Sequence, residues 1–188
     1  MPKLIALAGV LKKTSGIKRV LGLASEIARS EGARVETLDL ADFDMPLFSE
    51  DFDFKGAPPP GAVALTEAFR GADGFILSAP EYNLSIPGPL KNAIDWLSTA
   101  SPNPFLDKSG LLMSASPSMS GGNRGLWHLR VPLEYLGAHV YPQMFSLALS
   151  HQAYGEDGKL TDRKIADLLE ITVRGFVRVT RAIASAKG

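Results

Sequence analysis

Short runs of apolar residues alternate with amphipathic segments along the chain. The runs KLIALAG (3–9), RVETLDL (34–40), GFILSAP (74–80), GLLMSAS (110–116) and AHVYPQM (138–144) are typical of strands. Apolar residues recur at helical spacing around 17–28, around 62–71, in the second half of 79–98, in 123–136 and in 165–177. The pattern therefore predicts five strands, each followed by a helix.

Strands that alternate with helices indicate an α/β protein whose sheet is mainly parallel and covered by helices on both faces. Right-handed crossovers make this a doubly wound fold, a three-layer sandwich. Five strands favour the flavodoxin-like order 2-1-3-4-5 over the six-stranded Rossmann order. The chain shows no internal repeat or linker, so we expect residues 1–188 to form a single domain.

Composition indicates which partners and which cellular compartment to expect. Twenty basic residues balance twenty acidic ones, which argues against a nucleic-acid partner, and cysteine is absent. The apolar run LIALAGVL is followed, not preceded, by Lys12 and Lys13, the reverse of a signal peptide. No apolar run is long enough to span a bilayer. We therefore expect a cytoplasmic protein without a membrane partner.

Three loops are expected at one edge of the sheet. Ligands of open parallel sheets bind outside the carboxyl ends of the strands, where the strand order reverses. The segments that arrive there are 9–16 after the first strand, 80–88 after the third and 116–125 after the fourth. All three are rich in Ser, Thr, Gly, Asn or Pro and run into a helix. They are the candidate ligand-binding loops.

The first loop, GVLKKTSG (9–16), has features of a phosphate cradle. Its backbone amides, an N-cap at Thr14 or Ser15 and the start of the next helix would all favour an anion. It matches neither the Walker A pattern nor the dinucleotide pattern G-x-G-x-x-G. An ordinary capped helix start with solvated lysines is the alternative interpretation.

The second loop, PEYNLSIPG (80–88), is the more specific one. Pro80, Pro87 and the following Pro89 restrict the backbone that carries Glu81, Tyr82 and Asn83. Such a segment can present backbone polar groups to the edge of a flat heterocycle, and Tyr82 adds a ring and a hydroxyl. The alternative is a simple proline-limited turn between a strand and a helix.

The third loop, SPSMSGGNRG (116–125), could form a further wall of the site or be only a flexible connection. No G-x-S-x-G nucleophile elbow occurs, and the three histidines have no metal spacing. Glu81 is the only carboxylate expected in the site, so no acid–base pair presents itself. We therefore predict no catalytic side chain and no metal, with a cofactor carrying the chemistry.

The segment PEYNLSIPGPLKNAIDW (80–96) resembles the signature of the NADPH-dependent FMN reductase family, a flavodoxin-like group that includes quinone, azo and chromate reductases. GGNRGLWHLRVPLEYLGA (121–138) is similar to the family's Gly-Gly-x-Arg helix start. The resemblance implies bound FMN and a homodimer or homotetramer with flavin close to the subunit interface. It also implies hydride transfer from NADPH or NADH through flavin to quinones or similar acceptors.

The resemblance also implies a set of FMN-binding residues. These are Gly9, Val10, Leu11, Lys12, Thr14, Ser15, Gly16 and Ile17 at the phosphate, Pro80, Glu81, Tyr82 and Asn83 at the ring, and Ser114, Ala115 and Ser116 near the ring. The family's phosphate loop usually reads Gly-Ser-x-Arg-x-x-Ser-x-Asn. Here Gly9 and Ser15 match, whereas Val10, Lys12 and Ile17 replace a hydroxyl, a guanidinium and an amide. We therefore expect FMN to bind but to be lost readily on purification. The double change Val10→Ser and Ile17→Asn should tighten FMN binding.

Two other functions remain open at this point. A flavodoxin-like electron carrier would share the fold, although carriers dock through strongly charged faces and the net charge here is zero. A family member with weakened or lost FMN binding is the second alternative. We also expect an oligomer interface on the helices after the second and third loops, through Trp96, Trp127, Leu129 and Leu133.

Overall fold

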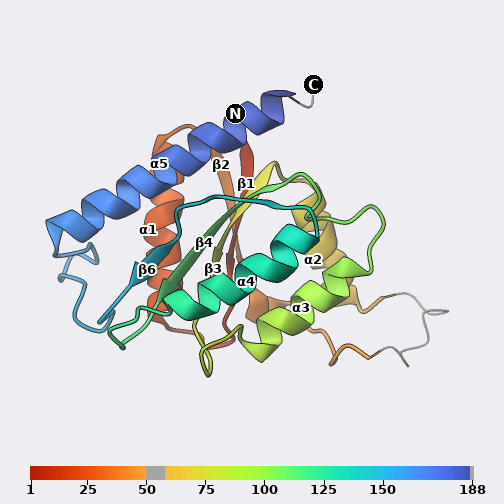
Figure 1. Ribbon diagram of the computed structural model, residues 1–188, viewed down its shortest axis with the longest axis horizontal. Helices are drawn as coiled ribbons and strands as arrows, with labels where there is room; N and C mark the ends of the chain where they lie inside the picture. The colour runs from red at the N-terminus through yellow and green to blue at the C-terminus, as the bar shows by residue number, and fades with distance from the viewer. Residues whose placement is uncertain (50–57, 187–188) are drawn as a thin grey trace.

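A parallel sheet forms the centre of the molecule. The computed structural model describes residues 1–49 and 58–186, with β1 (Lys3–Ala8), β2 (Arg34–Asp39), β3 (Gly74–Ser78), β4 (Ser109–Ala115), β5 (His139–Val140) and β6 (Phe145–Leu147). The strand order is β2-β1-β3-β4-β5, with β6 paired to β4 (Figure 1). The predicted flavodoxin-like order is therefore confirmed.

Helices cover both faces of the sheet. They are α1 (Gly16–Ser30), α2 (Pro60–Arg70), α3 (Gly88–Ser98), α4 (Asn123–Tyr135) and α5 (Arg163–Ala186), and a short 3-10 helix spans Leu40–Asp42. Leu4, Ala6 and Ala8 pack with α1 and α5, whereas Ile5 and Leu7 pack with α2, α3 and α4. This alternation follows from the opposite directions of successive strand side chains, and it produces the three layers seen in Figure 1.

The fifth predicted strand, 138–144, is only partly formed. β5 covers His139–Val140 and pairs with the start of β4, whereas β6 pairs with its end. Pro142 lies between them and has no backbone N–H to give to a neighbouring strand, so the edge is interrupted there. The sheet consequently has a sixth short strand that the sequence pattern missed.

Most of the apolar residues expected at an oligomer interface belong to the monomer core. Trp96, Leu129 and Leu133 are 2%, 1% and 0% exposed, so that part of the expectation is wrong. Trp127 is 56% exposed and remains available on the outer face of α4. Among the described residues, no helix combines the length and apolar character needed to cross a membrane.

Candidate functional site

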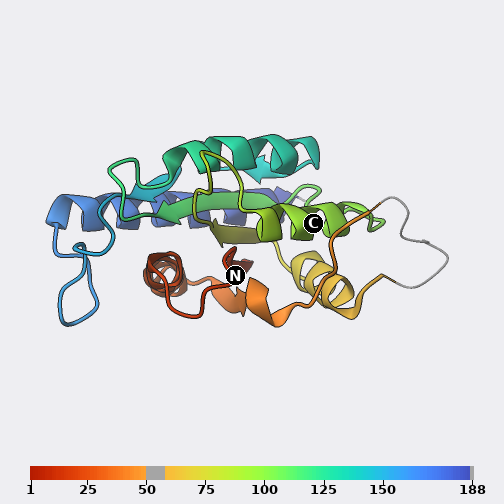
Figure 2. The same cartoon turned by 90° about the horizontal axis from the view of Figure 1, so that it is seen from below.

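The three candidate loops leave the sheet side by side. Gly9 N donates to Ser78 O over 2.8 Å, and Ala79 N donates to Met113 O over 2.9 Å, which ties the ends of β1, β3 and β4 together. In Figure 2 the loop after β3 rises beside the start of α4. We call the segments 9–15, 80–87 and 116–122 together the loop site. Its position at the carboxyl edge of the sheet is the one expected for a ligand.

The first loop presents unused backbone donors. Leu11, Lys12, Lys13 and Thr14 are exposed, and their amides donate to no other group in the described parts of the chain. Ser15 is the N-cap of α1, with its hydroxyl accepting from Lys18 N at 3.4 Å. Orphan amides beside a helix N-terminus fit an anion such as a phosphate.

Val10 of this loop and Ile17 in the first turn of α1 have side chains that point into the core. Val10 and Ile17 are 5% and 3% exposed and belong to the core cluster between the sheet, α1 and α5. Their side chains therefore fill the core, and only their backbone can contribute to a phosphate site. This placement revises the expectation for Val10→Ser and Ile17→Asn, because the new polar groups would enter the core rather than the loop site.

Only part of the nearby positive charge is available to an anion. Lys18 forms an ion pair with Asp39, at the end of β2. The guanidinium of Arg19 lies 3.8 Å from the ring centroid of Tyr154. Burial, partly offset by Arg19, raises the pKa of Tyr154 to about 12. Lys12 and Lys13 are therefore the exposed cations of the first loop.

The second loop is a tight turn. Tyr82 and Ser85 exchange two backbone hydrogen bonds of 3.1 and 3.0 Å. Asn83 and Leu84, between them, have φ of 49° and 66°. Positive φ at both central residues is the property of a type I′ turn. Asn tolerates this conformation, whereas Leu84 is strained by about 1–2 kcal/mol.

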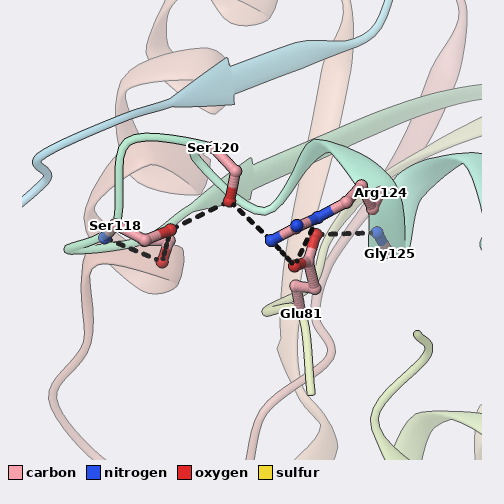
Figure 3. Close-up of polar contacts among 6 residues, drawn as sticks. Glu81, Ser118, Ser120, Arg124 and Gly125 are labelled. Atoms are coloured by element: carbon pink, nitrogen blue, oxygen red, sulfur yellow. Dashed lines mark hydrogen bonds and ion pairs between the residues drawn. The ribbon is translucent and has the colours of Figure 1, made fainter. Parts of the chain in front are cut away.

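Glu81 joins the second loop to the third (Figure 3). Its Oε1 accepts hydrogen bonds from Arg124 Nε and Nη2 at 3.0 and 2.7 Å, and its Oε2 accepts one from Gly125 N at 3.0 Å. The Glu81 side chain is only 8% exposed. Both carboxylate oxygens are thus used inside the protein, at the N-terminus of α4, where a negative charge is favoured.

The Glu81 carboxyl is held in its ionised form. Burial by itself would raise its pKa, but the hydrogen bonds from Arg124 and Gly125 and the Arg124 charge outweigh burial, so the pKa lies below the ordinary value of 4.5. A group of this kind suits a fixed ion pair better than proton transfer near neutral pH. The geometry accordingly makes Glu81 a clamp between loops.

The third loop carries a chain of hydroxyls. Ser116 Oγ lies 3.0 Å from Ser118 Oγ, which lies 2.9 Å from Ser120 Oγ, and Arg124 Nη2 donates to Ser120 Oγ over 3.2 Å. Gly121 and Gly122 follow with φ of 62° and 84°, a conformation that favours glycine. The segment is therefore an organised wall of the loop site and not a loose connection.

Ser114, at the end of β4, has a buried and unsatisfied hydroxyl. The residue is 0% exposed, and its Oγ has no hydrogen-bond partner among the described residues. A Cβ at Gly122 would come within 2.1 Å of this oxygen, so glycine is needed there. The hydroxyl thus lies beneath the backbone of Gly122, and the close approach of the third loop to the end of β4 depends on this glycine.

Sequence reasoning missed Ser150 and the partner of Glu81. Ser150 is 8% exposed, donates its amide to Ser116 O over 3.0 Å and lies beside Gly16, where a Cβ would be 3.1 Å from its Oγ. It comes from a distant part of the chain that carried no motif. His128 contacts Ser85, with Nδ1 3.1 Å from Oγ, and the described residues contain no cluster suited to a metal ion.

The chain is similar to known flavin enzymes over most of its length. The family described as NADPH-dependent FMN reductase matches residues 2–152. An NAD(P)H:quinone oxidoreductase from Solanum tuberosum is 36% identical over 167 residues, 86% of this chain and 84% of that protein. A quinone reductase from Escherichia coli strain K12 is 36% identical over 135 residues, 71% of this chain and 72% of that protein.

Solved structures agree with this assignment. FerB, a flavoenzyme NAD(P)H:(acceptor) oxidoreductase from Paracoccus denitrificans, matches with a TM-score of 0.81 and 25% identity, covering 97% of this chain and 98% of FerB. The flavodoxin-like fold, the orphan donors of the loop site and the family match lead to the same conclusion. This chain belongs to the NADPH-dependent FMN reductase family.

Proposed function

We propose that this protein binds FMN in the loop site and passes a hydride from NADPH or NADH to quinones or similar acceptors. The observation that carries the proposal is the convergence of unused donors at the carboxyl edge of the sheet. The exposed amides of Leu11 to Thr14 make up this set. The named relatives are quinone oxidoreductases or FMN reductases, which supports the same reaction.

The donor set fits FMN in two parts. The first loop, with its amides, Ser15 and exposed Lys12, would hold the phosphate at the start of α1. The turn at Asn83 and the half-exposed ring of Tyr82 would border the isoalloxazine from the second loop. The hydroxyls of the third loop would face the cofactor from the other side.

FMN supplies the redox chemistry by accepting a hydride and giving two electrons onward. The residues of the protein would bind and orient this cofactor. Glu81 and Arg124 fix the distance between the second and third loops, and the turn at Asn83 presents backbone polar groups. Because Glu81 is held ionised by Arg124 and Gly125, we assign it a positioning role and no proton transfer.

Titration of the apoprotein with FMN, followed by steady-state oxidation of NADPH with menadione, tests this function. We expect a flavin visible spectrum and turnover that requires both FMN and the quinone. A pure electron carrier would bind FMN without oxidising NADPH. A protein that has lost the cofactor would show no spectral change at saturating FMN. Either result would refute the proposal.

We further propose a homodimer or homotetramer. Trp127, Val131 and Tyr135 are 56%, 68% and 88% exposed and recur every four residues on α4. Such a stripe of large apolar side chains is typical of an interface, and its aromatic members favour association. Trp127→Lys should shift the protein toward monomer in light scattering, and a wild-type monomer at micromolar concentration would rule the interface out.

Residues 1–188 would act as one domain, since α5 packs on the same core cluster as α1. A single unfolding transition for the whole chain, followed by two probes, would support this.

We also infer a cytoplasmic location, where NADPH is the reductant, and cell fractionation tests it. Quinone-like molecules are the proposed small-molecule partners.

A further inference from the structure

The segment between β6 and α5, residues 148–162, lies against the third loop. Leu149 N donates to Ser118 O over 3.2 Å, and Ser150 N donates to Ser116 O over 3.0 Å. These two backbone hydrogen bonds fix the segment to a wall of the loop site. A part of the chain without any recognisable motif is therefore held close to the proposed ligand.

Ser150 and Tyr154 bring this segment onto the first turn of α1. The Tyr154 hydroxyl lies 3.4 Å from Gly16 O, and a Cβ at Gly16 would come within 3.1 Å of Ser150 Oγ. Burial, partly offset by Arg19, raises the pKa of Tyr154 to about 12, so its hydroxyl stays protonated at neutral pH and can donate to the Gly16 carbonyl. The half-buried tyrosine ring is therefore a fixed surface beside the helix start.

Arg19 lies on the ring of Tyr154. Its guanidinium carbon is 3.8 Å from the ring centroid, which is a cation–π contact. Arg19 N donates to the carbonyl of Ser15, the N-cap of α1, so Arg19 stands one turn into the helix. Side chains of an α-helix lean toward its N-terminus, which places this guanidinium over the first turn. The contact of Tyr154 with Gly16 agrees with that position.

The N–H groups of the Arg19 side chain have no hydrogen-bond or ion-pair partner in the described parts of the chain, whereas the neighbouring Lys18 is paired with Asp39. Arg19 is exposed, so a ligand can reach its five donors, and its charge is permanent. Ser150, which is 8% exposed, likewise has a hydroxyl without a partner among the described residues. Both groups lie at the end of α1 where the amides of 11–14 are unused. Together they form a donor set for a phosphate.

We propose that Arg19 and Ser150 bind the phosphate of FMN, and that Tyr154 is the positioning residue that holds Arg19 in place. The inference rests on the proposed function and adds two phosphate-binding residues outside the loop pattern of the family. In the first loop Lys12 stands where that pattern has a guanidinium, and Arg19 would supply the bidentate donor from α1 instead. Ser150 would add a hydroxyl beside Gly16.

Riboflavin has the ring of FMN without the phosphate, so the ratio of its Kd to that of FMN measures the contribution of the phosphate. Both Kd values are obtained by titrating the apoprotein and following flavin fluorescence. Arg19→Ala should weaken FMN binding about tenfold or more, as expected for the loss of a charge-assisted hydrogen bond, and leave riboflavin binding unchanged. Arg19→Lys should restore only part of the FMN affinity, because it keeps the charge without the planar fork.

Further variants test the other two residues and the specificity of the effect. Tyr154→Leu should reproduce part of the Arg19→Ala loss for FMN, whereas Tyr154→Phe keeps the ring and should retain most of the affinity. Ser150→Ala should weaken FMN binding less than Arg19→Ala does, with riboflavin binding again unchanged. Arg178→Ala is the matched control, because this exposed arginine lines a cavity with Glu31, at the far end of α1. It removes the same charge and should change neither Kd.

The outcomes separate this inference from the proposed function. An apoprotein that binds neither flavin would overturn the proposed function itself. If the wild type prefers FMN to riboflavin and Arg19→Ala keeps the same ratio of Kd values, Arg19 does not hold the phosphate. Equal losses for both flavins would show that Arg19 acts only on the structure of the site. Equal wild-type affinity for both flavins would show that no group here recognises the phosphate.

Discussion

The first and second loops of the site stand on neighbouring strands, yet the protein holds them by different means. The second loop is closed by its own turn hydrogen bonds and by Glu81, which joins it to α4. The first loop is anchored from below by Val10 and Ile17, and its exposed amides have no partner in the described structure. The second loop is held by contacts within the protein, whereas the first loop leaves exposed donors that a ligand can use.

This difference agrees with the proposed binding of the FMN phosphate by the first loop and of its ring by the second. A flat ring is recognised by groups whose positions are set before binding, because preorganisation avoids an ordering cost. A phosphate is held by backbone N–H groups that have no partner within the protein, as at a helix N-terminus.

Ile17→Asn should destabilise the protein most. Ile17 is 3% exposed, and the change both removes core packing and buries an amide, for a loss of about 3–5 kcal/mol in the free energy of unfolding. Urea unfolding measures it, with Ile17→Val as the conservative control. Tighter FMN binding at unchanged stability would show instead that residue 17 faces the phosphate.

Glu81→Gln should lower the free energy of unfolding by less than Ile17→Asn does. The change weakens charge-assisted hydrogen bonds to Arg124 and Gly125, and because Arg124 is half exposed we expect a loss of about 1–3 kcal/mol. FMN affinity should fall too, since the two loops are no longer held together. Glu134→Gln is the matched control: the Glu134 side chain is 45% exposed, against 8% for Glu81, so the loss of its charge in the pair with Arg130 should have little effect.

The effect of Glu81→Gln should depend on pH. The folded-state pKa of Glu81 lies below 4.5, so its ionised form stabilises the native state above that pH, and this contribution is lost as the pH falls through the folded-state pKa. The stability difference between wild type and Glu81→Gln should therefore be constant near neutrality and shrink below about pH 4.5. A difference independent of pH would contradict the ion pair.

Leu84→Asn should stabilise the protein slightly. Leu84 has φ of 66°, and Asn tolerates this conformation, so we expect a gain of about 1 kcal/mol. Thermal unfolding of the apoprotein measures it. Leu84→Ala keeps the unfavourable φ and should give no such gain, which distinguishes relief of strain from loss of an exposed apolar side chain.

Lys12→Ala should have the smallest effect. Lys12 is exposed at the open loop, so its removal should weaken FMN binding a few-fold at low salt and less at high salt, while unfolding stays unchanged. FMN titration at two ionic strengths checks this. The same change in affinity at both salt concentrations would mean that Lys12 does not act through its charge.

Much of the fold could be predicted because its signals are local. The alternation of strand and helix patterns determines the β/α order, and right-handed crossovers with five strands lead to the observed topology. The three candidate loops follow from the same rule, since ligand sites lie at carboxyl strand ends. Pro142 was a local signal as well, but the pairing of β6 with β4 depends on a distant strand.

The sequence by itself therefore determined the fold class, the family and the location of the loop site. Tertiary structure decided how the residues in that location are used. The partners of Glu81 lie 43 and 44 residues away, Ser150 reaches the first loop from a distant segment, and Val10 and Ile17 turn inward. Such contacts depend on how layers pack and which way a side chain points, because a loop sequence has no periodicity that sets its direction.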